Sequence, residues 1–363
     1  MTIFNKIKIK RFRGIDELEL NKFKQFNLIV GKNDTGKTSV LEALYISINP
    51  GNPNLPITTN VHRGIDTIEN NNQFWISLFK DYNIDNLIEL DLLLFTKQKL
   101  KINIKPKVVP SSIINEKLRL DISNGTTTTE QIIQGLRTSF NYESNNGTQP
   151  INQHTEIIFN PSNPQKPLDT KLPSGWKPIL NGYYLSIQNT YGPDLASRVG
   201  ELITLKQEKE LVEVLQEFDK RIKDINLSGT SKVLVDIDGI PQRILINSLG
   251  EGIYRIANII TLIYRARNGV VIIDEVETGL DRNSQRKLMK AIFKASLKYN
   301  VQIFFSTHSI ELIDSFYETS VLEKKEDDIS LIRLERRDDR VINPVYFDYQ
   351  QIQYSRDQGW EVR

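Results

Sequence analysis

The chain begins with an alternation of apolar and basic residues. Ile7 and Ile9 alternate with Lys8 and Lys10, which is the period-2 pattern of a strand with one face in solvent. The segments "LELNKF" and "FNLIVG" follow as two more predicted strands, and "KTSVLEALYISI" is predicted as a helix. Residues 49–72 are rich in Asn, Pro and Thr, and this composition predicts a loop.

Short β-like runs follow, separated by turn-forming tracts. A helix at "NQFWISLFKDY" and a strand at "LIELDLLLF" lead into residues 96–180, where "LKINIKPKVV", "EKLRLDI" and "TEIIFN" are predicted strands. Tracts such as "SNGTTTT" and "SNNGTQP" are typical of turns. The pattern predicts a β-rich insertion with loose hairpin tips.

Residues 202–225 show helical periodicity. One stripe holds the apolar residues Leu211, Leu215, Phe218, Ile222 and Ile225, with Lys and Glu between them. The stripe covers only two or three heptads, which favours a packed helix over a coiled-coil arm.

The C-terminal half alternates strands and helices. A hairpin at "KVLVDIDGIPQRILI" is followed by a helix ("GIYRIANIITLIYRARN"), a strand ("VVIIDE"), a helix ("DRNSQRKLMKAIFKASLKY"), a strand ("QIFFSTHS") and a helix. Such alternation predicts a parallel sheet buried on both faces, and therefore an α/β fold. We expect three parts: an N-terminal β lobe (1–95), the β-rich insertion (96–180), and a helical segment with a parallel α/β lobe (181–363).

Composition narrows the functional classes. The net charge of +2 is not that of a nucleic-acid coat protein. The basic start "KIKIKRFR" has two interpretations: a local DNA-binding patch, or a strand with one solvated face. No cysteine is present, which excludes disulfides, Cys-ligated zinc and a cysteine nucleophile. No apolar run approaches 18 residues and no signal-peptide h-region is visible, so we expect a soluble cytoplasmic protein without a membrane partner.

The stretch "GKNDTGKTS" has the G-x-x-x-x-G-K-[ST] spacing of a phosphate-binding loop (Walker A), between an apolar strand and a helix. Its glycines let backbone N–H groups turn toward phosphates, Lys37 reaches the β- and γ-phosphates, and the Thr38 hydroxyl ligates Mg²⁺. The sequence therefore predicts a nucleotide-binding loop. Its residues are Gly31, Lys32, Asn33, Asp34, Thr35, Gly36, Lys37, Thr38 and Ser39.

A second half of such a site occurs at "GVVIIDEVE" (Walker B). Four apolar residues predict a buried strand, and Asp274 at its end would hold Mg²⁺. Glu275 would act as the general base that polarises the attacking water. Adjacent carboxylates at the end of a buried strand are costly without a cation, although a surface acidic cluster is the alternative interpretation.

The long interval between Lys37 and Asp274 does not fit a compact P-loop kinase or GTPase, nor a ring-forming AAA+ enzyme. A split nucleotide site with a long insertion is the arrangement of ATP-binding cassette (ABC) ATPases and their chromosome-maintenance relatives. The segment "NSLGEG" resembles the signature loop of that group, with Ser248 and Gly250 in place and Glu251 between the glycines. A simple helix N-cap turn remains the alternative for this segment.

In the same group, "FFSTHS" places His308 where the switch histidine senses the γ-phosphate; a structural histidine at a strand end is the alternative. The resemblance also implies that "ETGLD" crosses a dimer interface, where Ser248 and Gly250 close the partner's site. Arg13, in "RFRG", would lie near the nucleotide, unless it is a surface arginine.

The chain thus resembles the ABC-type ATPases that include RecF, the Rad50/SMC heads and the overcoming-lysogenization-defect (OLD) nucleases. The resemblance is strong over residues 1–50 and 240–315. No long coiled coil divides the halves, and the sequence after His308 is too short for the OLD Toprim domain. The "DIDG" segment at Asp236–Gly239 is better explained as a type I′ hairpin than as a Toprim D-x-D. Gln73 and Gln98 both stay open as the family's Q-loop residue.

The resemblance extends to the ATPase subunits of two-gene anti-phage systems such as PARIS and Septu. It implies an ATP- and Mg²⁺-dependent ATPase that forms a head-to-tail homo-oligomer and scaffolds a separate effector nuclease, such as a Toprim or HNH protein. A RecF-like repair ATPase that binds DNA directly and a non-enzymatic scaffold remain as alternatives. The C-terminal "YSRDQGWEVR" either packs on the last helix or is available for docking.

Overall fold

The computed structural model describes residues 2–65, 72–110, 131–145, 149–160, 163, 165–178, 180–186, 194–229, 232–337, 341–360 and 362. The predicted strand "EKLRLDI" and the "SNGTTTT" tract lie outside these residues. Two large sheets dominate the described chain, one antiparallel and one mainly parallel.

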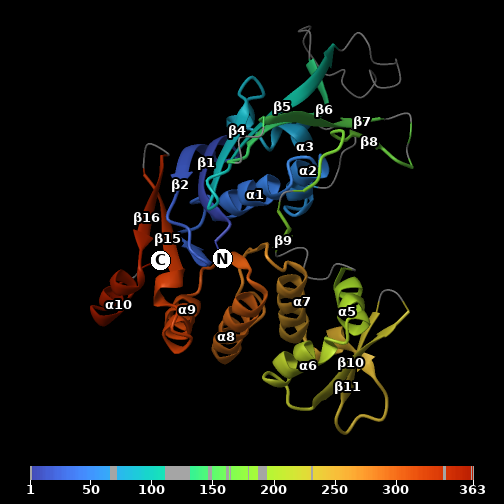
Figure 1. The fold of residues 1–363 in the computed structure, drawn as a ribbon, viewed down its shortest axis with the longest axis vertical. Helices are drawn as coiled ribbons and strands as arrows, with labels where there is room; N and C mark the ends of the chain where they lie inside the picture. Colours follow the sequence, from blue (N-terminus) through green and yellow to red (C-terminus); the bar gives the residue numbers. More distant parts are fainter. Residues whose placement is uncertain are drawn as a thin grey trace, which may run out of the picture.

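The antiparallel sheet has seven strands in the order β2–β1–β4–β5–β6–β7–β8 (Figure 1). They are β1 (Phe4–Phe12), β2 (Ile15–Leu20), β4 (Ile88–Leu94), β5 (Lys99–Pro110), β6 (Gln131–Glu143), β7 (Ile151–Phe159) and β8 (Leu168–Lys171). As the alternation predicted, Ile7 and Ile9 are fully buried. Leu90 of β4 stands opposite Ile102 of β5, so the β-rich segment extends the N-terminal sheet. The division of the chain into three parts stays a prediction.

The second sheet has six strands in the order β16–β15–β3–β14–β13–β9. They are β3 (Phe26–Val30), β9 (Gly182–Leu185), β13 (Val270–Ile273), β14 (Gln302–Ser306), β15 (Ile329–Arg336) and β16 (Ile342–Phe347). All neighbours pair in parallel except β15 and β16. Every residue of β3, β13 and β14 is buried, so the prediction of a parallel sheet covered on both faces is confirmed.

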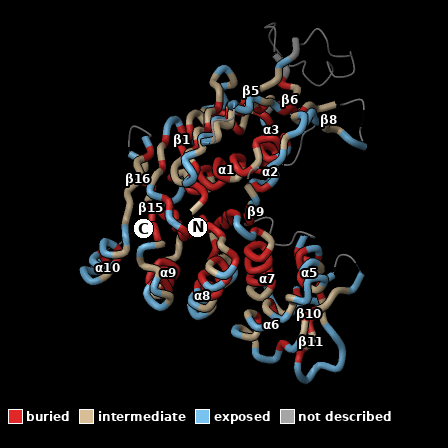
Figure 2. Tube along the Cα trace, in the orientation of Figure 1, coloured by how far each residue is buried: buried red, intermediate tan, exposed pale blue. Residues whose placement is uncertain are grey.

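Helix α1 (Lys37–Ile48) lies between the two sheets, where it contacts β1 and β4 on one side and β9, β13 and β14 on the other (Figures 1 and 2). Helices α7 (Glu251–Arg265), α8 (Arg282–Tyr299) and α9 (Ile310–Leu322) cover the opposite face of the six-stranded sheet. Helix α8 starts as predicted because the Asp281 carboxylate accepts from Asn283 N and Ser284 N as its N-cap.

Two predicted elements were wrong in the N-terminal half. The predicted loop at residues 49–72 contains helix α2 (Asn54–Val61), because Leu55 and Ile57 are buried in the core that α1 shares. The predicted helix at "NQFWISLFKDY" breaks into α3 (Asn72–Ile76) and the 3₁₀ turn η1 (Lys80–Tyr82). It breaks because Phe79 forms a bridge to Phe12 of β1.

The predicted helix at residues 202–225 is confirmed in its first part, where Leu211 and Leu215 are buried in a helix, and is wrong from Ile222 on. The chain forms α5 (Asp194–Thr204), α6 (Glu208–Gln216) and then strand β10 (Ile222–Ser228). A register irregularity between Ile222 and Asp224 lets Ile222 and Ile225 both be buried in a strand, although their spacing is helical. The periodicity therefore pointed to the wrong element.

Strands β10, β11 (Lys232–Ile237) and β12 (Ile244–Leu245) form a third, small sheet. The predicted hairpin is confirmed, with Val235 opposite Ile244. The predicted type I′ turn is wrong. Such a turn requires a positive φ at both central residues, and Gly239 has one whereas Asp238 does not. The 3₁₀ turn η4 (Ile246–Leu249) then leads into α7.

The C-terminal tail packs on the last helices. After η5 (Glu326–Asp328) and the β15–β16 hairpin, α10 (Tyr349–Asp357) begins at Asp348 with a capping box. Arg356 forms ion pairs with Asp314 and Glu318 of α9, as the packing interpretation of this tail expects.

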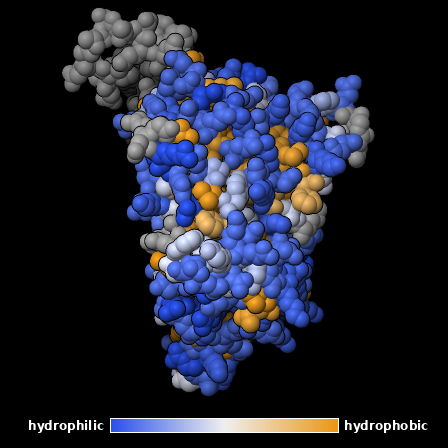
Figure 3. Space-filling model, turned by 90° about the vertical axis from the view of Figure 1, so that its left-hand side faces the viewer, coloured by the Kyte–Doolittle hydropathy of each residue, from blue (hydrophilic) through white to orange (hydrophobic). Residues whose placement is uncertain are grey.

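No helix in the described part of the chain has both the length and the apolar character to cross a membrane. The face drawn in Figure 3 is mostly hydrophilic, with hydrophobic side chains in small groups.

Candidate nucleotide-binding site

The predicted phosphate-binding loop follows β3 at the carboxyl edge of the six-stranded sheet. A Cβ atom at Gly31 would lie 2.5 Å from the carbonyl oxygen of Leu334 and 2.8 Å from Thr35 Oγ1, so only glycine fits there. Gly36 has φ 94° and precedes α1, whose N-terminus receives no side-chain cap. The first N–H groups of α1 therefore carry the partial positive charge that attracts anions.

Lys37 is buried inside this loop. Its side-chain Nζ donates to Gly31 O at 2.8 Å and to Lys32 O at 3.0 Å, and only 6% of the residue is exposed. Thr35 Oγ1 donates to Lys32 O at 2.9 Å and closes the loop. An ammonium held beside the N-terminus of a helix is a suitable environment for phosphate.

The other residues of the loop differ in exposure. Ser39 is buried, Thr38 is half-buried, and Lys32 and Asn33 are exposed. Asp34, also exposed, forms a 3.1 Å ion pair with Arg336 at the end of β15.

A cavity of about 520 Å³ lies beside the loop, between residues 31–35 and 333–337. Arg333, Arg336 and Arg337 belong to its wall. Sequence reasoning missed these arginines because they follow the loop by about 300 positions and reach it only through the β3–β15 pairing.

Asp274 lies at the same edge of the sheet, directly after β13. It is 4% exposed; its Oδ1 accepts a hydrogen bond from the hydroxyl of Ser306, and its Oδ2 lies 3.5 Å from Tyr184 OH. The backbone N–H of Glu275 donates to Ser306 Oγ at 2.9 Å. Ser306 therefore holds the carboxylate of Asp274 and the backbone of Glu275, and its sequence signal is a polar residue at the end of an apolar strand.

Glu275 lies close to His308. Its Oε1 is 3.7 Å from His308 Nε2, and the side chains are 38% and 35% exposed. Burial, followed by the charges of Asp274 and Glu277, raises the pKa of Glu275, which suits a proton acceptor. The charge of Lys37 opposes this shift, so the loop and these carboxylates interact electrostatically.

Arg255 was not singled out from the sequence. It is fully buried on α7, and its NH2 group donates to Asp274 O at 3.0 Å and Glu275 O at 2.6 Å. Glu277 accepts a 2.7 Å bond from His308 N and is the carboxylate that acts most strongly on the Arg255 charge. Arg255 thus links the helix after the signature segment to the turn that carries Glu275. An arginine within the apolar run "GIYRIANII" was the available signal.

Arg13 belongs to a buried cluster on the other side of the loop. Its Nε donates to Glu42 Oε2 at 3.0 Å and its NH2 group to Thr59 Oγ1 at 2.8 Å. Arg63 donates to both oxygens of Glu42 and, at 3.2 Å, to Ser39 Oγ. Burial lowers the pKa of Arg13 to about 10, although Glu42 opposes the shift. The surface-arginine alternative is wrong, and a nucleotide contact of Arg13 stays a prediction.

The signature segment lies outside the Lys37–Asp274–Glu275–His308 cluster. Ser248, Gly250 and Glu251 are exposed, and Gly250 has φ 99° before α7. This segment packs on the loop after Glu275: a Cβ at Gly279 would lie 3.2 Å from the Cγ of Glu251. Exposure of this kind leaves the segment accessible to a second protomer.

The Q-loop position stays open. Gln98 lies in the β4–β5 turn, where Thr96 Oγ1 donates to its side chain at 2.9 Å, and Gln73 is exposed in α3.

The donor set fits Mg²⁺ in the form that nucleotide sites use. Magnesium is bound through one or two carboxylates together with substrate phosphates, rather than by a cage of protein ligands. Asp274 and the Thr38 hydroxyl would supply oxygen ligands of this kind. The described residues contain no group of three or more His, Cys, Asp or Glu that could hold a metal by itself.

The chain matches two family models. Residues 1–174 match the model described as "AAA ATPase domain", and residues 158–314 match "AAA domain, putative AbiEii toxin, Type IV TA system". The chain is 24% identical over 369 residues to the "ATP/GTP phosphatase" of Helicobacter pylori (strain ATCC 700392 / 26695), covering 94% of this chain and 95% of that protein. A stretch of 42 residues is 50% identical to the DNA replication and repair protein RecF of Geobacter sulfurreducens (strain ATCC 51573 / DSM 12127 / PCA), covering 12% of each.

Among solved structures, the fold is similar to an SMC head bound to the C-winged helix domain of ScpA. The TM-score is 0.51 at 12% identity, with 97% of this chain and 99% of that chain covered. The fold is that of an ABC ATPase head, as the sequence predicted. With the family models and the phosphatase relative, it supports an ATPase of the AAA and SMC-like type.

Proposed function

We propose that this chain is an ATPase subunit whose two composite sites form when two protomers associate head-to-tail across ATP and Mg²⁺. This proposal rests on one observation: a cluster at one sheet edge contains Lys37, Asp274, Glu275 and His308, whereas Ser248 is exposed outside that cluster. One protomer thus holds one half of a site and presents the other half to its partner.

Each residue has a role in this proposal. Lys37 and the N-terminus of α1 bind the β- and γ-phosphates. Glu275 accepts the proton of the water that attacks the γ-phosphorus, and the bond to the ADP oxygen breaks. His308 senses the γ-phosphate from beside Glu275, while Ser248 and Gly250 of the partner subunit donate to it. Thr38 and Asp274 would hold Mg²⁺, which would supply positive charge to neutralise the phosphates.

Hydrolysis would govern how the assembly holds a separate effector nuclease, such as a Toprim or HNH protein, in anti-phage defence. Resemblance to the ATPase halves of two-gene defence systems supports this role. The description of one matching family model names a putative toxin of a type IV toxin–antitoxin system, and such a system also agrees with a role in defence.

The test compares wild type with Glu275→Gln by light scattering and ATP turnover. The variant keeps the size of the side chain but loses the base, so we expect ATP binding to remain and turnover to fall at least about 100-fold. The ATP-dependent associated form should accumulate. Normal turnover by Glu275→Gln would contradict the assignment of Glu275 as the general base. A mass unchanged by ATP would contradict the ATP-dependent association of two protomers.

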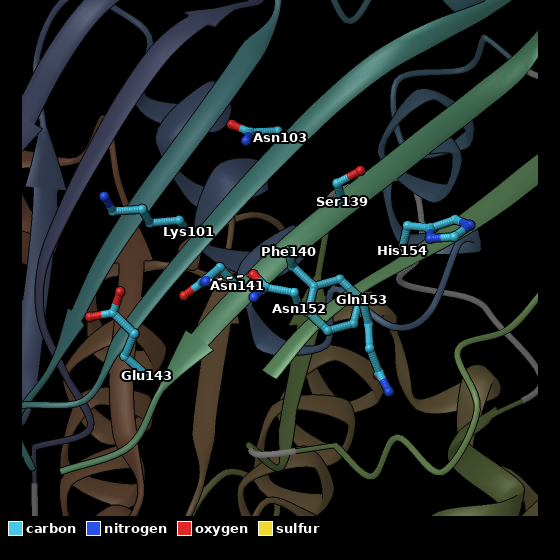
Figure 4. A pocket seen from close by; sticks show the side chains of 9 residues that line it. All are labelled: Lys101, Asn103, Ser139, Phe140, Asn141, Glu143, Asn152, Gln153 and His154. Atoms are coloured by element: carbon cyan, nitrogen blue, oxygen red, sulfur yellow. Dashed lines mark hydrogen bonds between the residues drawn. The ribbon is translucent and has the colours of Figure 1, made fainter. Parts of the chain in front are cut away.

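A second candidate, a RecF-like ATPase that binds DNA directly, is favoured by the outer face of the seven-stranded sheet. A pocket of about 380 Å³ lies there, and Figure 4 shows the side chains that line it, among them Lys101, Asn103, Ser139 and His154. Lysines and asparagines can contact DNA phosphates.

This face carries compensating acidic groups, which is why DNA binding ranks second. Lys101 stands opposite Asp91, and Lys107 pairs with Glu156 at 2.7 Å. If DNA binds here, duplex DNA should stimulate turnover, and Lys101→Glu should abolish the stimulation without changing basal turnover. Turnover that is indifferent to duplex DNA at low salt would remove this candidate.

A further inference from the structure

A second cavity, of about 510 Å³, lies beside β9, the last strand of the six-stranded sheet. Helices α1 and α2 form one wall, and α5 and α7 form the other. Tyr184 of β9 belongs to the core around α1, whereas Leu185 belongs to the core around α7. The cavity therefore lies where the two cores meet, and its volume is within the range of small-molecule sites, about 300–1,000 Å³.

The edge of β9 that faces away from β13 offers backbone hydrogen-bonding groups to this cavity. The carbonyl oxygens of Asn181 and Leu185 accept from Val270 N and Asp274 N, so they face β13. Because backbone groups alternate in direction along a strand, Gly182 and Tyr184 direct their N–H and C=O groups away from β13. Both residues line the cavity. Two residues are too few to hold an extended peptide, but their spacing suits the donor and acceptor edge of a planar heterocycle.

Three aromatic rings that line this cavity pack against one another. The centroids of Tyr45 and Tyr184 are 5.3 Å apart, those of His62 and Tyr184 are 5.2 Å apart, and those of Tyr45 and His62 are 6.2 Å apart. Rings grouped in this way favour stacking and edge contacts with a flat aromatic ligand.

The polar side chains of the walls leave little net charge for an anion. Arg198 is 4% exposed and donates to Asp194, Asn258 and Thr261, so its charge is already compensated. Burial lowers the pKa of His62 to about 4, which keeps this imidazole neutral at pH 7. A neutral ring fits these walls better than a phosphate group does.

We propose that this cavity is a second ligand site, separate from the phosphate-binding loop, for a neutral heteroaromatic molecule of nucleoside size. The binding itself does not require that the chain hydrolyses ATP. A regulatory effect would rest on the proposed function. Tyr184 OH lies 3.5 Å from Asp274 Oδ2, and Asn258 follows Arg255 by about one turn of α7. An occupant that moves these residues would change the rate of ATP turnover.

The test is isothermal titration calorimetry with adenosine, guanosine, cytidine and uridine in turn. Thr58→Trp would fill the cavity, because Thr58 lines it and is half-buried. The matched control is Asn54→Trp, in the same helix and exposed, outside the lining residues. Tyr45→Leu is a second variant, which keeps the cavity but removes one ring. Thermal melting checks that each variant folds.

We expect at least one nucleoside to bind wild type with one-to-one stoichiometry. Thr58→Trp should weaken it by about tenfold or more, Tyr45→Leu by about fivefold, and Asn54→Trp by less than about twofold. No binding by any of the four probes, or binding unchanged in Thr58→Trp, would overturn the proposal. The latter result would place the bound nucleoside outside this cavity. Neither result depends on hydrolysis, so failure here is distinct from failure of the proposed ATPase.

Discussion

Ser306 provides a direct test of how the sheet edge holds the candidate catalytic carboxylates. Its hydroxyl donates to Asp274 Oδ1 and accepts from Glu275 N, and the residue is fully buried. Ser306→Ala removes one oxygen atom, and water has no access to replace it. A hydrogen bond to a charged group contributes about 1.5–3 kcal/mol. If all of this energy is needed in the transition state, kcat falls by about 10- to 160-fold.

The assay is steady-state phosphate release at saturating ATP and Mg²⁺. We expect kcat to fall while the KM for ATP changes less than about threefold, because Lys37 and the loop are not altered. Ser330→Ala is the matched control: Ser330 is also a buried serine in a strand of the same sheet, and it lies outside the cluster. A kcat of Ser306→Ala within twofold of wild type would refute the idea that this hydroxyl orients Asp274 and Glu275.

Three further outcomes follow from the buried charges. Burial raises the pKa of Glu275, so its ionised form destabilises the fold above that pKa; Glu275→Gln should raise the melting temperature at pH 8, and the gain should disappear near pH 4. An equal gain at both pH values would contradict this. Arg255→Met removes a donor from the buried carbonyl of Asp274, whereas the carbonyl of Glu275 still accepts from Thr278, so the free energy of unfolding in urea should fall by about 1–3 kcal/mol. Glu42→Gln leaves Arg13 and Arg63 with uncompensated charge and should cost about 3–5 kcal/mol, whereas a cost below about 1 kcal/mol would contradict the ion cluster.

The accuracy of the sequence predictions depended on how local each signal was. The α1 helix has the predicted bounds because Gly36 and the apolar run after it are contiguous in the chain. The strands β13 and β14 also matched closely, because a short apolar run that ends in polar residues is a local signal. Helix α2 was missed, since its apolar residues are few and its stability depends on tertiary contacts such as those with α1 and Phe74.

The β10 strand shows how a local signal can mislead. Ile222 and Ile225 are three residues apart, as in a helix, and both are buried. The irregularity before Asp224 makes that spacing compatible with a strand, and it is fixed by pairing with β11. Periodicity alone cannot distinguish these two cases.

By itself, the sequence determined the phosphate-loop pattern, the Walker B carboxylates, His308 and the parallel α/β class, because each depends on neighbouring residues in the chain. The tertiary structure alone decided which distant side chains hold them. Ser306 reaches Asp274 because β14 lies between β3 and β13, and Arg255 reaches the same turn from α7. Residues far apart in the sequence carry no mark of being neighbours, since strand order and helix packing follow from the burial of whole faces rather than from any one residue.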